Sequence, residues 1–536
     1  MSGNNYYIFS KSRCGDTVPS IITLSGETKP LHSMIDPKRE AQRLVSTITE
    51  DTGFVVFFGI GGGFAPNAAL EHTKAQVIVI DFNKDGIEEL FSNIDYSLLR
   101  ANDRFKFLID PSKEDLITLI LENYKPALHG GIKTIPLRTR TEQDREKFEL
   151  AAVILQEAID TVSSDYSVQA HFGKRWFSNI IRNVKASDKH GSSLLEDYKS
   201  GNITDTAIAA AGPSLDSQIH KLKEFKSNNG FIISTDTALG ALLHNNITPD
   251  AVLSIDCQHI SLYHFMCGNI LKNRDIPLIM DIASPPLLAN FSKNYAFFSS
   301  GHPLALYLRK YWRPLSLLDT SGGNVTYACL SLAENIGSKR ITLFGADFSY
   351  VGCRSYARGT YIYRYFYERQ NRLSSLEKQF SAFLYRSPFL KNENDEKKNY
   401  SETSSLRFYR KKLEDKSSSM DAEINFATGF GAPVNIKKNS QKSVSNCQFT
   451  AQINNNKTVN MSGSEFLEQY RNDILALPEA DGKENYSLYL NDKDREIFTT
   501  LLPSAAAIKK RNSNLRHNDL IEEVKRYCAG EIDKLL

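Results

Sequence analysis

The chain has 536 residues, too many for one hydrophobic core, so about two to four domains are expected. Apolar residues at 41%, charged residues at 24% and a net charge of +3 are near globular averages and give no sign of nucleic-acid binding. The seven cysteines are scattered without a CxxC pair, which argues against a zinc site or a disulfide framework. With no apolar N-terminal core and no run near the roughly 18 apolar residues of a spanning helix, we expect a soluble cytoplasmic protein without membrane insertion.

The first predicted unit is a strand, a glycine turn, a helix and a second strand. Residues 53–58 (GFVVFF) have a buried-strand pattern, residues 65–74 favour a helix, and residues 75–80 form the second strand, which ends at Asp81. An acid at the tip of the second strand is typical of a half-Rossmann arrangement. We therefore expect a Rossmann-like N-terminal domain over residues 1–140.

The glycines of this turn have the spacing GxGxG. They are Gly59, Gly61 and Gly63, and Phe64 stands where a dinucleotide fingerprint has its third glycine. The turn is therefore more like a methyltransferase turn, and a site for S-adenosylmethionine that depends on Asp81 is one interpretation. A degenerate Rossmann scaffold that binds nothing is the other.

A helical connector and a second α/β series follow. Residues 141–200 are read as the connector, because FELAAVILQEAIDTV has an apolar stripe at helical spacing. The compact apolar runs of the second series are residues 205–211, 230–234, 251–255, 276–282, 295–299 and 340–344. Their alternation with helical segments predicts a mostly parallel sheet with helices on both faces, whose ligands bind at the carboxyl ends of the strands. Residues 201–365 form this predicted central domain.

The character of the sequence changes after residue 360. Residues 361–390 are rich in aromatic and basic side chains at helical spacing, and residues 391–441 form a polar stretch. From residue 459 the pattern is helical again. We expect a mostly helical C-terminal domain over residues 366–536 with a mobile segment inside it.

A turn of small residues follows the first strand of the central series. In AAGPSLD, Gly212 leaves room for a ligand, Pro213 suits the first turn of a helix, and Ser214 offers a hydroxyl and a backbone N–H. The positive end of the following helix favours a phosphate. A helix cap beside a tight turn is the structural alternative.

Acids and hydroxyls follow the next two strands. Thr235 and Asp236 come after one of them, and Asp256 comes after the other. Each alone would be unremarkable at a solvated strand end. As a set at successive strand tips they suit ribose hydroxyls, a base edge or a metal.

A second turn of small residues precedes a later helix. It consists of Thr320, Ser321 and Gly322, and it can present backbone amides to a phosphate or a base.

The last strand of the series ends in an acid. This is Asp347, and Tyr350, Tyr356 and Arg358 lie just beyond it. Tyrosine and arginine at such a position could neutralise a departing phosphate.

Taken together, these segments resemble one family. GPSLD, TDTAL, SIDCQ, the run from TSGGNV to FGADFSY, and SYARGT are similar to the MptE-like family, which contains the motility accessory factors, the Maf glycosyltransferases of flagellin. The central domain of that family in turn resembles bacterial sialyltransferases that use CMP-activated sialic acid. The resemblance covers about residues 205–360 well, and it implies an α/β protein with a sialyltransferase-like central domain. The flanking domains agree with the family in layout rather than in motif.

The resemblance implies a nucleotide site. In the sialyltransferases a GPSL turn and a TSG turn hold the cytidine nucleotide, and the GxDFY strand end and the SYA tyrosine belong to the same site. Ser214, Ser321, Asp347 and Tyr356 match residue by residue. The implied donor-binding set, with the strand tips included, is Gly212, Pro213, Ser214, Thr235, Asp236, Asp256, Thr320, Ser321, Gly322, Asp347, Tyr350 and Tyr356.

This chain departs from the sialyltransferase pattern at two points. Ala211 stands where those enzymes have asparagine before the GPSL glycine. They also carry a catalytic histidine downstream of the SYA tyrosine, whereas no histidine occurs here between His302 and His517. The candidates for the catalytic base are therefore Asp236, Asp256 and Asp347.

The implied activity is the transfer of a nonulosonic acid, such as pseudaminic or legionaminic acid, from its CMP-activated form to Ser or Thr of flagellin before export. No tightly bound cofactor is expected, and a need for a divalent metal stays open. Flagellin is the expected partner, with the aromatic and basic face at residues 364–372 as an acceptor platform. The alternatives are pyrophosphate transfer to a hydroxymethylpterin, as in some MptE-like relatives, and a non-enzymatic flagellin-binding assembly factor.

Overall fold

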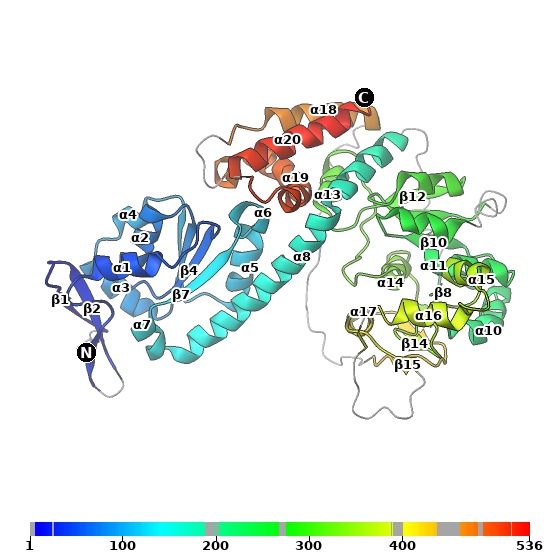
Figure 1. Cartoon of the computed structure of the whole chain (residues 1–536), viewed down its shortest axis with the longest axis horizontal. Helices are drawn as coiled ribbons and strands as arrows, with labels where there is room; N and C mark the ends of the chain where they lie inside the picture. Colours follow the sequence, from blue (N-terminus) through cyan, green and yellow to red (C-terminus); the bar gives the residue numbers. More distant parts are fainter. Residues whose placement is uncertain are drawn as a thin grey trace. The chain divides into compact units, whose positions relative to one another are not determined.

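The structure is a computed structural model that describes residues 6–23, 26–187, 198, 203–266, 275–386, 388–389, 400–436, 461–480, 486–515 and 517–536. The chain forms two compact units (Figure 1). The first comprises Met1–Lys174 with Asn472–Gly530, and the second comprises Arg175–Arg471 with Glu531–Leu536. Helix α8 (Arg145–Ala186) runs from the first unit into the second. No described helix combines the length and the apolar composition that crossing a bilayer requires.

The first unit contains two sheets. A three-stranded antiparallel sheet has the order β1 (Tyr7–Lys11), β2 (Thr17–Ile22), β3 (Thr28–Pro30), and a four-stranded parallel sheet has the order β6 (Phe105–Ile109), β5 (Gln76–Asp81), β4 (Phe54–Phe58), β7 (Ile132–Pro136). Every residue of β4 and β5 is buried, as expected for central parallel strands covered on both faces. The predicted strand, glycine turn, helix and strand are present, with α2 (Phe64–His72) as the helix.

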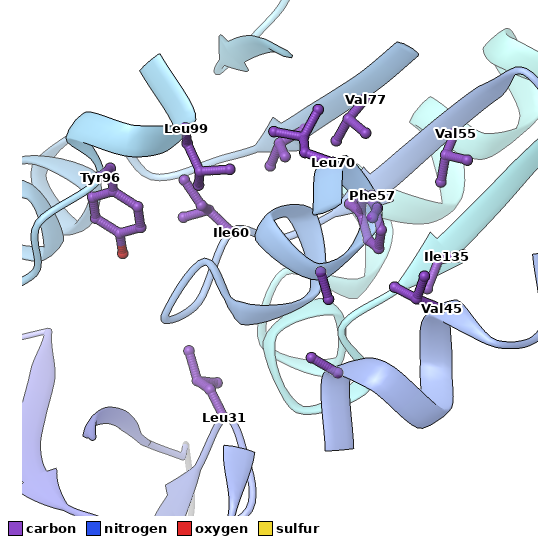
Figure 2. Packing of buried hydrophobic residues seen from close by; sticks show 14 of the residues in the cluster. Leu31, Val45, Val55, Phe57, Ile60, Leu70, Val77, Tyr96, Leu99 and Ile135 are labelled. Carbon is purple, nitrogen blue, oxygen red and sulfur yellow. The ribbon is translucent and has the colours of Figure 1, made fainter. Parts of the chain in front are cut away.

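Helices cover both faces of this parallel sheet. They are α1 (Pro37–Val45), α2, α3 (Lys84–Asn93), α4 (Ser97–Arg100), α5 (Lys113–Asn123), α6 (Pro126–His129), α7 (Arg138–Gln143) and the first part of α8. On one face Val55, Phe57 and Val77 pack with Leu70 of α2 and Leu99 of α4 (Figure 2). On the other face the strand residues alternate with these and pack against α5 and α8. The alternation along each strand thus supplies two separate cores.

The C-terminal helices do not form a separate domain. The described helices of the predicted domain 366–536 are instead divided between the two units. In the first unit Ala506 of α19 (Asp492–Arg511) is fully buried against Ala127 and Ala170. Such small side chains let helix backbones approach closely, which accounts for the docking of α19 there. The remaining elements of this region are η3 (Tyr486–Tyr489), α18 (Gly463–Ala476) and α20 (His517–Asp533).

The second unit is built on a seven-stranded sheet in which every pair is parallel. Its order is β12 (Tyr295–Phe298), β11 (Leu278–Asp281), β10 (Ala251–Ser254), β9 (Phe231–Thr235), β8 (Asp205–Ala209), β13 (Arg340–Phe344), β16 (Glu423–Phe426). The predicted central α/β sheet is therefore confirmed. The chain moves outward from β8 to β12 and then returns to place β13 on the other side of β8. The strand order thus reverses between β8 and β13, and ligands of open α/β sheets bind at such a switch point.

Helices again cover both faces of the sheet. They are α10 (Leu215–Ser227), α11 (Asp236–His244), η1 (His259–Phe265), η2 (Pro286–Phe291), α13 (Pro303–Tyr311), α14 (Val325–Asn335), α15 (Tyr361–Arg369), α16 (Leu376–Leu384) and α17 (Ser404–Ser419). On one face α14 packs against β8, β9 and β10. On the other, α10 and α11 enclose a core with residues of β8 and β9. A short antiparallel pair, β14 (Tyr350–Val351) and β15 (Tyr400–Ser401), lies beyond β13.

The polar stretch 391–441 contains regular secondary structure where the structure describes it. Residues 391–399 and 437–441 lie outside the described residues, whereas residues 400–436 contain β15, α17 and β16. Strand β16 pairs with β13 at the edge of the sheet, where polar side chains are tolerated. Helix α17 buries Leu413 completely in the core beside α14. One apolar contact on an otherwise polar helix is a weak sequence signal, so the sequence did not indicate this helix.

Candidate functional site

The carboxyl ends of β8 and β13 are joined by hydrogen bonds at the switch point. Ala210 N donates to Phe344 O at 2.8 Å, and Gly212 N donates to Gly345 O at 2.9 Å. A Cβ on Gly212 would lie 2.5 Å from Asp347 Oδ2 and from Gly345 O, so only glycine fits this approach. The GPSL turn and the strand end that carries Asp347, both singled out in the sequence, are therefore neighbours in space.

Ser214 and Asp347 form the centre of this junction. Ser214 N donates to Asp347 Oδ2 at 2.8 Å, and the residues are only 1% and 6% exposed. Burial raises the pKa of the Asp347 carboxyl, and hydrogen bonds from Ser214 act in the opposite direction. Ser214 precedes α10, but its side chain makes no capping hydrogen bond to that helix. The helix-cap interpretation of the GPSL turn is therefore not supported.

A loop from the distant polar stretch completes the junction. Phe430 N donates to Ser214 Oγ at 2.8 Å, and Ala432 N donates to Asp347 O at 3.0 Å. Gln218 of α10 holds the same loop by donating to Ala427 O at 3.1 Å and to Thr428 O at 3.0 Å. This 427–432 loop follows β16, and the sequence gives no motif that would have identified it. Because both the N–H and the hydroxyl of Ser214 are engaged, a phosphate here would have to compete with protein groups.

Asp236 and Thr235 are buried and fully engaged at the end of β9. Asp236 Oδ2 accepts from Ser254 Oγ at 2.8 Å, and its Oδ1 accepts from Thr237 N at 2.6 Å. Thr235 Oγ1 accepts from Ala238 N and donates to Ala209 O, both at 3.2 Å. Thr235 therefore caps α11, and Asp236 ties the ends of β9 and β10 together. A buried carboxylate whose oxygens are both hydrogen-bonded has a structural role, and it is poorly placed to take a proton from the hydroxyl of an acceptor substrate.

Asp256 has the more accessible carboxyl. It is half-buried, and its Oδ1 accepts from Gln258 N at 2.9 Å. Burial raises the pKa of Asp256, the charge of Asp236 raises it further, and His264 acts in the opposite direction. The ring of His264 meets Tyr361 edge-on at 4.8 Å between centroids. The sialyltransferase pattern did not indicate His264, because this residue lies in η1, before the predicted tyrosines, whereas the histidine of that pattern lies after them.

The turn 320–322 is shaped by its own neighbours. Ser321 N donates to Asp319 Oδ1 at 2.9 Å, and Tyr327 OH donates to Asp319 Oδ2 at 2.6 Å. A Cβ on Gly322 would lie 2.2 Å from the Tyr327 ring, so glycine is required. Thr320 O accepts from the N–H of the second glycine of the turn at 3.0 Å. Ser321 itself is exposed at the N-terminal end of α14, where a ligand could reach it.

The segment after β14 is anchored to α10 and to the β8 exit. Ala357 N donates to Ala211 O at 2.9 Å. Arg354 Nη1 donates to Asp216 Oδ2 at 2.7 Å, and Arg358 N donates to Asp216 Oδ1 at 2.9 Å. These contacts hold the predicted tyrosine, Tyr356, beside the junction.

Two tyrosine hydroxyls near the junction are neutral donors at physiological pH. Burial raises the pKa of Tyr356 to about 12 and also raises the pKa of Tyr350. Arg386, whose guanidinium lies 4.0 Å above the Phe383 ring, acts in the opposite direction on both. Neutral phenols and one guanidinium are suited to stabilising a phosphate.

Helix α8 closes the other half of the carboxyl edge. Asn183 Nδ2 donates to Ile282 O and Ser284 O, both at 2.8 Å, and Asn179 Nδ2 donates to Cys257 O and Ala283 O at 3.1 and 2.8 Å. These contacts satisfy backbone carbonyl groups of the segments that follow β10 and β11. No periodic pattern in α8 marked the two asparagines. The two asparagines do not contact the ends of β8, β9 or β13, and Asp256, which follows β10, stays half-exposed.

The glycine turn of the first unit is filled by the protein's own side chains. His32 Nε2 accepts from Gly62 N at 2.8 Å, and a Cβ on Gly61 would lie 2.4 Å from that nitrogen. Arg140 pairs with Asp81, the residue that a bound nucleoside would need. Burial lowers the pKa of His32 to about 4, so its ring is neutral. The S-adenosylmethionine interpretation is not supported, and a scaffold without a ligand fits the contacts.

The comparisons with known proteins agree with this architecture. Residues 175–352 match the family model described as 6-hydroxymethylpterin diphosphokinase MptE-like. The fold of the whole chain is similar to the solved structure of a Maf glycosyltransferase from Magnetospirillum magneticum AMB-1. That similarity has a TM-score of 0.55 at 12% identity and covers 100% of this chain and 91% of the other, so it concerns the fold. The resemblance to the MptE-like family and to Maf glycosyltransferases that was drawn from the sequence is thus confirmed.

Three uncharacterised proteins of Treponema pallidum (strain Nichols) are also similar. One is 37% identical over 129 residues, a second 28% over 171 residues, and a third 23% over 239 residues. These matches cover 23%, 32% and 44% of this chain. The chain spans 45%, 80% and 51% of the respective relatives.

Proposed function

We propose that this protein is a cytoplasmic glycosyltransferase that moves a nonulosonic acid from its CMP-activated form to Ser or Thr of flagellin. The observation that carries the proposal is the Ser214–Asp347 junction at the β8/β13 switch point, with a 2.8 Å hydrogen bond between buried groups. The fold shared with a Maf glycosyltransferase supports the general class. The identities of the sugar, of the donor nucleotide and of flagellin as the acceptor are taken from the sequence resemblance.

The donor nucleotide would lie across the open part of the carboxyl edge. We assign it to the GPSL turn with Ser214 and to the turn that presents the exposed Ser321 at the start of α14. Both turns precede helices, whose N-terminal ends favour phosphate. Gly212 and Gly322 keep both turns compact, since a Cβ on either would collide with the site's own atoms.

In the proposed reaction the bond between the anomeric carbon and the CMP phosphate oxygen breaks, and the oxygen leaves with the electron pair. Tyr350 and Tyr356 would donate hydrogen bonds to that oxygen, with Arg386 adding positive charge. The acceptor hydroxyl oxygen bonds to the anomeric carbon, and its proton passes to a base. Of the three predicted acids, Asp256 is our choice, because it alone is half-exposed and its pKa is raised toward the working pH.

A second candidate is the transfer of pyrophosphate to a hydroxymethylpterin. It is favoured by the family model, whose description names that activity and which matches residues 175–352. A phosphate-binding switch point would serve either reaction. The two differ in product, because only the glycosyltransferase releases CMP.

The test combines purified protein with a deletion strain. Titration with CMP should show saturable binding, and a CMP-nonulosonate donor with unmodified flagellin should give flagellin heavier by the mass of the sugar. Deletion of the gene should remove mass from flagellin in sugar-sized steps. An unchanged flagellin mass in the deletion strain would reject the proposal. Formation of a pterin diphosphate from ATP and hydroxymethylpterin would favour the second candidate.

A further inference from the structure

A cavity of about 560 Å³ lies beside the short β14–β15 pair, next to the end of α16. Figure 1 shows these elements close together in the second unit. The volume is in the range of roughly 300–1,000 Å³ that is usual for binding pockets. Neither the predicted donor site nor the sequence motifs account for it, apart from Tyr350, which the two share.

The lining of the cavity is aromatic and carries no charge. Five rings contribute to it, with Cys353 beside them: Tyr350, Tyr385, Phe389, Tyr400 and Phe430. The Phe389 ring packs against Tyr385 at 5.0 Å and against Tyr350 at 6.0 Å between centroids. A phosphate or carboxylate enclosed by these rings would lose its hydration without meeting a cation in the lining. The lining therefore suits an apolar or aromatic group.

Two of the rings are also exposed to solvent. Tyr385 is 69% and Phe430 is 65% exposed, and the neighbouring Arg386 is exposed as well. Tyrosine, phenylalanine and arginine are the residue types that are enriched at the centres of protein–protein interfaces. Exposed aromatic rings around a cavity are thus typical of a surface that receives a polypeptide side chain.

The cavity shares residues with the proposed donor site. Phe430 lines the cavity through its ring, while its backbone N–H donates to Ser214 Oγ at 2.8 Å. Tyr350 follows Asp347 by three residues and also lines the cavity. A side chain held in the cavity would therefore place its own backbone near the Ser214–Asp347 junction.

We propose that this cavity holds an apolar or aromatic side chain of the polypeptide acceptor and so brings an adjacent Ser or Thr hydroxyl to the donor. The inference rests on the proposed function and assigns the polypeptide acceptor a place on the protein. It also predicts that acceptor sites have an apolar or aromatic residue close to the modified hydroxyl.

Equilibrium binding of unmodified flagellin, purified from a strain lacking this gene, tests the inference. Tyr385→Ala and Phe430→Ala each remove one exposed ring, whereas Phe408→Ala removes a 50%-exposed ring of α17 that does not line the cavity. The flagellin dissociation constant should rise about tenfold in the first two variants and stay within about twofold in the third. CMP affinity, measured on the same samples, should be unchanged in Tyr385→Ala and Phe408→Ala.

Equal flagellin binding by the wild-type protein and both cavity variants would overturn the inference, as would a wild-type protein that does not bind flagellin. A parallel loss of CMP and flagellin binding in Tyr385→Ala would also overturn it, because that ring would then serve the donor site or the fold. Failure of the proposed function would look different, since the wild-type protein itself would not bind CMP.

Discussion

Arg140 Nη2 lies 2.8 Å from Asp81 Oδ1, and the two side chains are 1% and 0% exposed. The remaining contacts of the pair are internal as well: Asp81 Oδ2 accepts from Ile60 N at 2.9 Å, and Arg140 Nη1 lies 2.6 Å from Asp144 Oδ2. Burial raises the pKa of Asp81, and the Arg140 charge opposes that effect. The acid at the tip of β5 thus serves the fold of the first unit.

Replacing one member of this pair should loosen the first unit. Arg140→Met leaves Asp81 buried without its cation and should cost about 3–5 kcal/mol, whereas the double change with Asp81→Leu should recover much of this. Hydrogen exchange in the β4 and β5 peptides reports the first unit directly. Unchanged exchange in Arg140→Met would contradict the structural role, as would saturable binding of S-adenosylmethionine by the wild-type protein.

Substitutions at the Ser214–Asp347 junction should weaken binding or turnover of the donor. Asp347→Asn removes a charge from the junction, and Ser214→Ala removes a hydroxyl. In both variants we expect CMP affinity or turnover to fall about tenfold or more. Ser227→Ala, at the far end of α10, is the matched control because its hydroxyl bonds only within the helix, to Lys223 O. Fluorescence of Trp176 and Trp312, the two tryptophans of the chain, reports folding of the second unit. Full activity with intact fluorescence would reject this site assignment.

Substitutions of Asp256 and Asp236 should have different effects, because we assign the role of catalytic base to Asp256 and a structural role to Asp236. Asp256→Asn should lower kcat by about 10²–10⁴-fold with little change in CMP affinity, since general-base catalysis contributes in that range. Its raised pKa means that wild-type kcat should fall as the pH drops through that pKa, because the protonated carboxyl cannot accept a proton. Asp236→Asn should instead lower the stability of the second unit, because Asp236 joins β9 to β10. A wild-type pH profile in Asp256→Asn would exclude it as the base.

Asp281 should make the second unit less stable as the pH rises. Burial at the end of β11 raises the pKa of Asp281 to about 6 in the folded protein, above its ordinary value of 3.8. The folded state therefore holds the proton more tightly, so the stabilisation is complete below about pH 4 and is lost as the pH rises to about 6. A shift of this size corresponds to roughly 3 kcal/mol. Urea unfolding followed by tryptophan fluorescence should show the decline, and Asp281→Asn should abolish it; a pH-independent midpoint in the wild type would contradict the prediction.

The sequence predicted those parts of the protein that depend on local pattern. Apolar runs located the strands, and small residues after β8 located the Gly212–Ser214 turn, because a close backbone approach leaves glycine as the permitted residue. The Gly59–Gly63 turn looked like a ligand site for the same reason. Only the structure shows that His32 and Arg140, distant in the sequence, occupy it.

The rest of the site depends on contacts between distant segments. The 427–432 loop meets Ser214 through a backbone N–H, which any residue except proline supplies, so its identity leaves no sequence signal. Asn179 and Asn183 act from α8 on carbonyl groups about 80 to 100 residues away in the chain, and a single sequence does not record such pairing. Asp236 was singled out correctly as a strand-tip acid, yet its burial and its bond to Ser254 depend on how β9 and β10 align.

Strand β16 determines where a soluble fragment of the second unit can end. A fragment ending at residue 352, where the family match stops, would lack β16 and leave the hydrogen-bonding edge of β13 uncovered. Uncovered edges pair with other chains, so such a fragment should aggregate. It would also leave Ser214 Oγ without Phe430 N and Gln218 without the carbonyl groups it holds. A soluble fragment that reproduces the switch point therefore has to include β16 and the 427–432 loop.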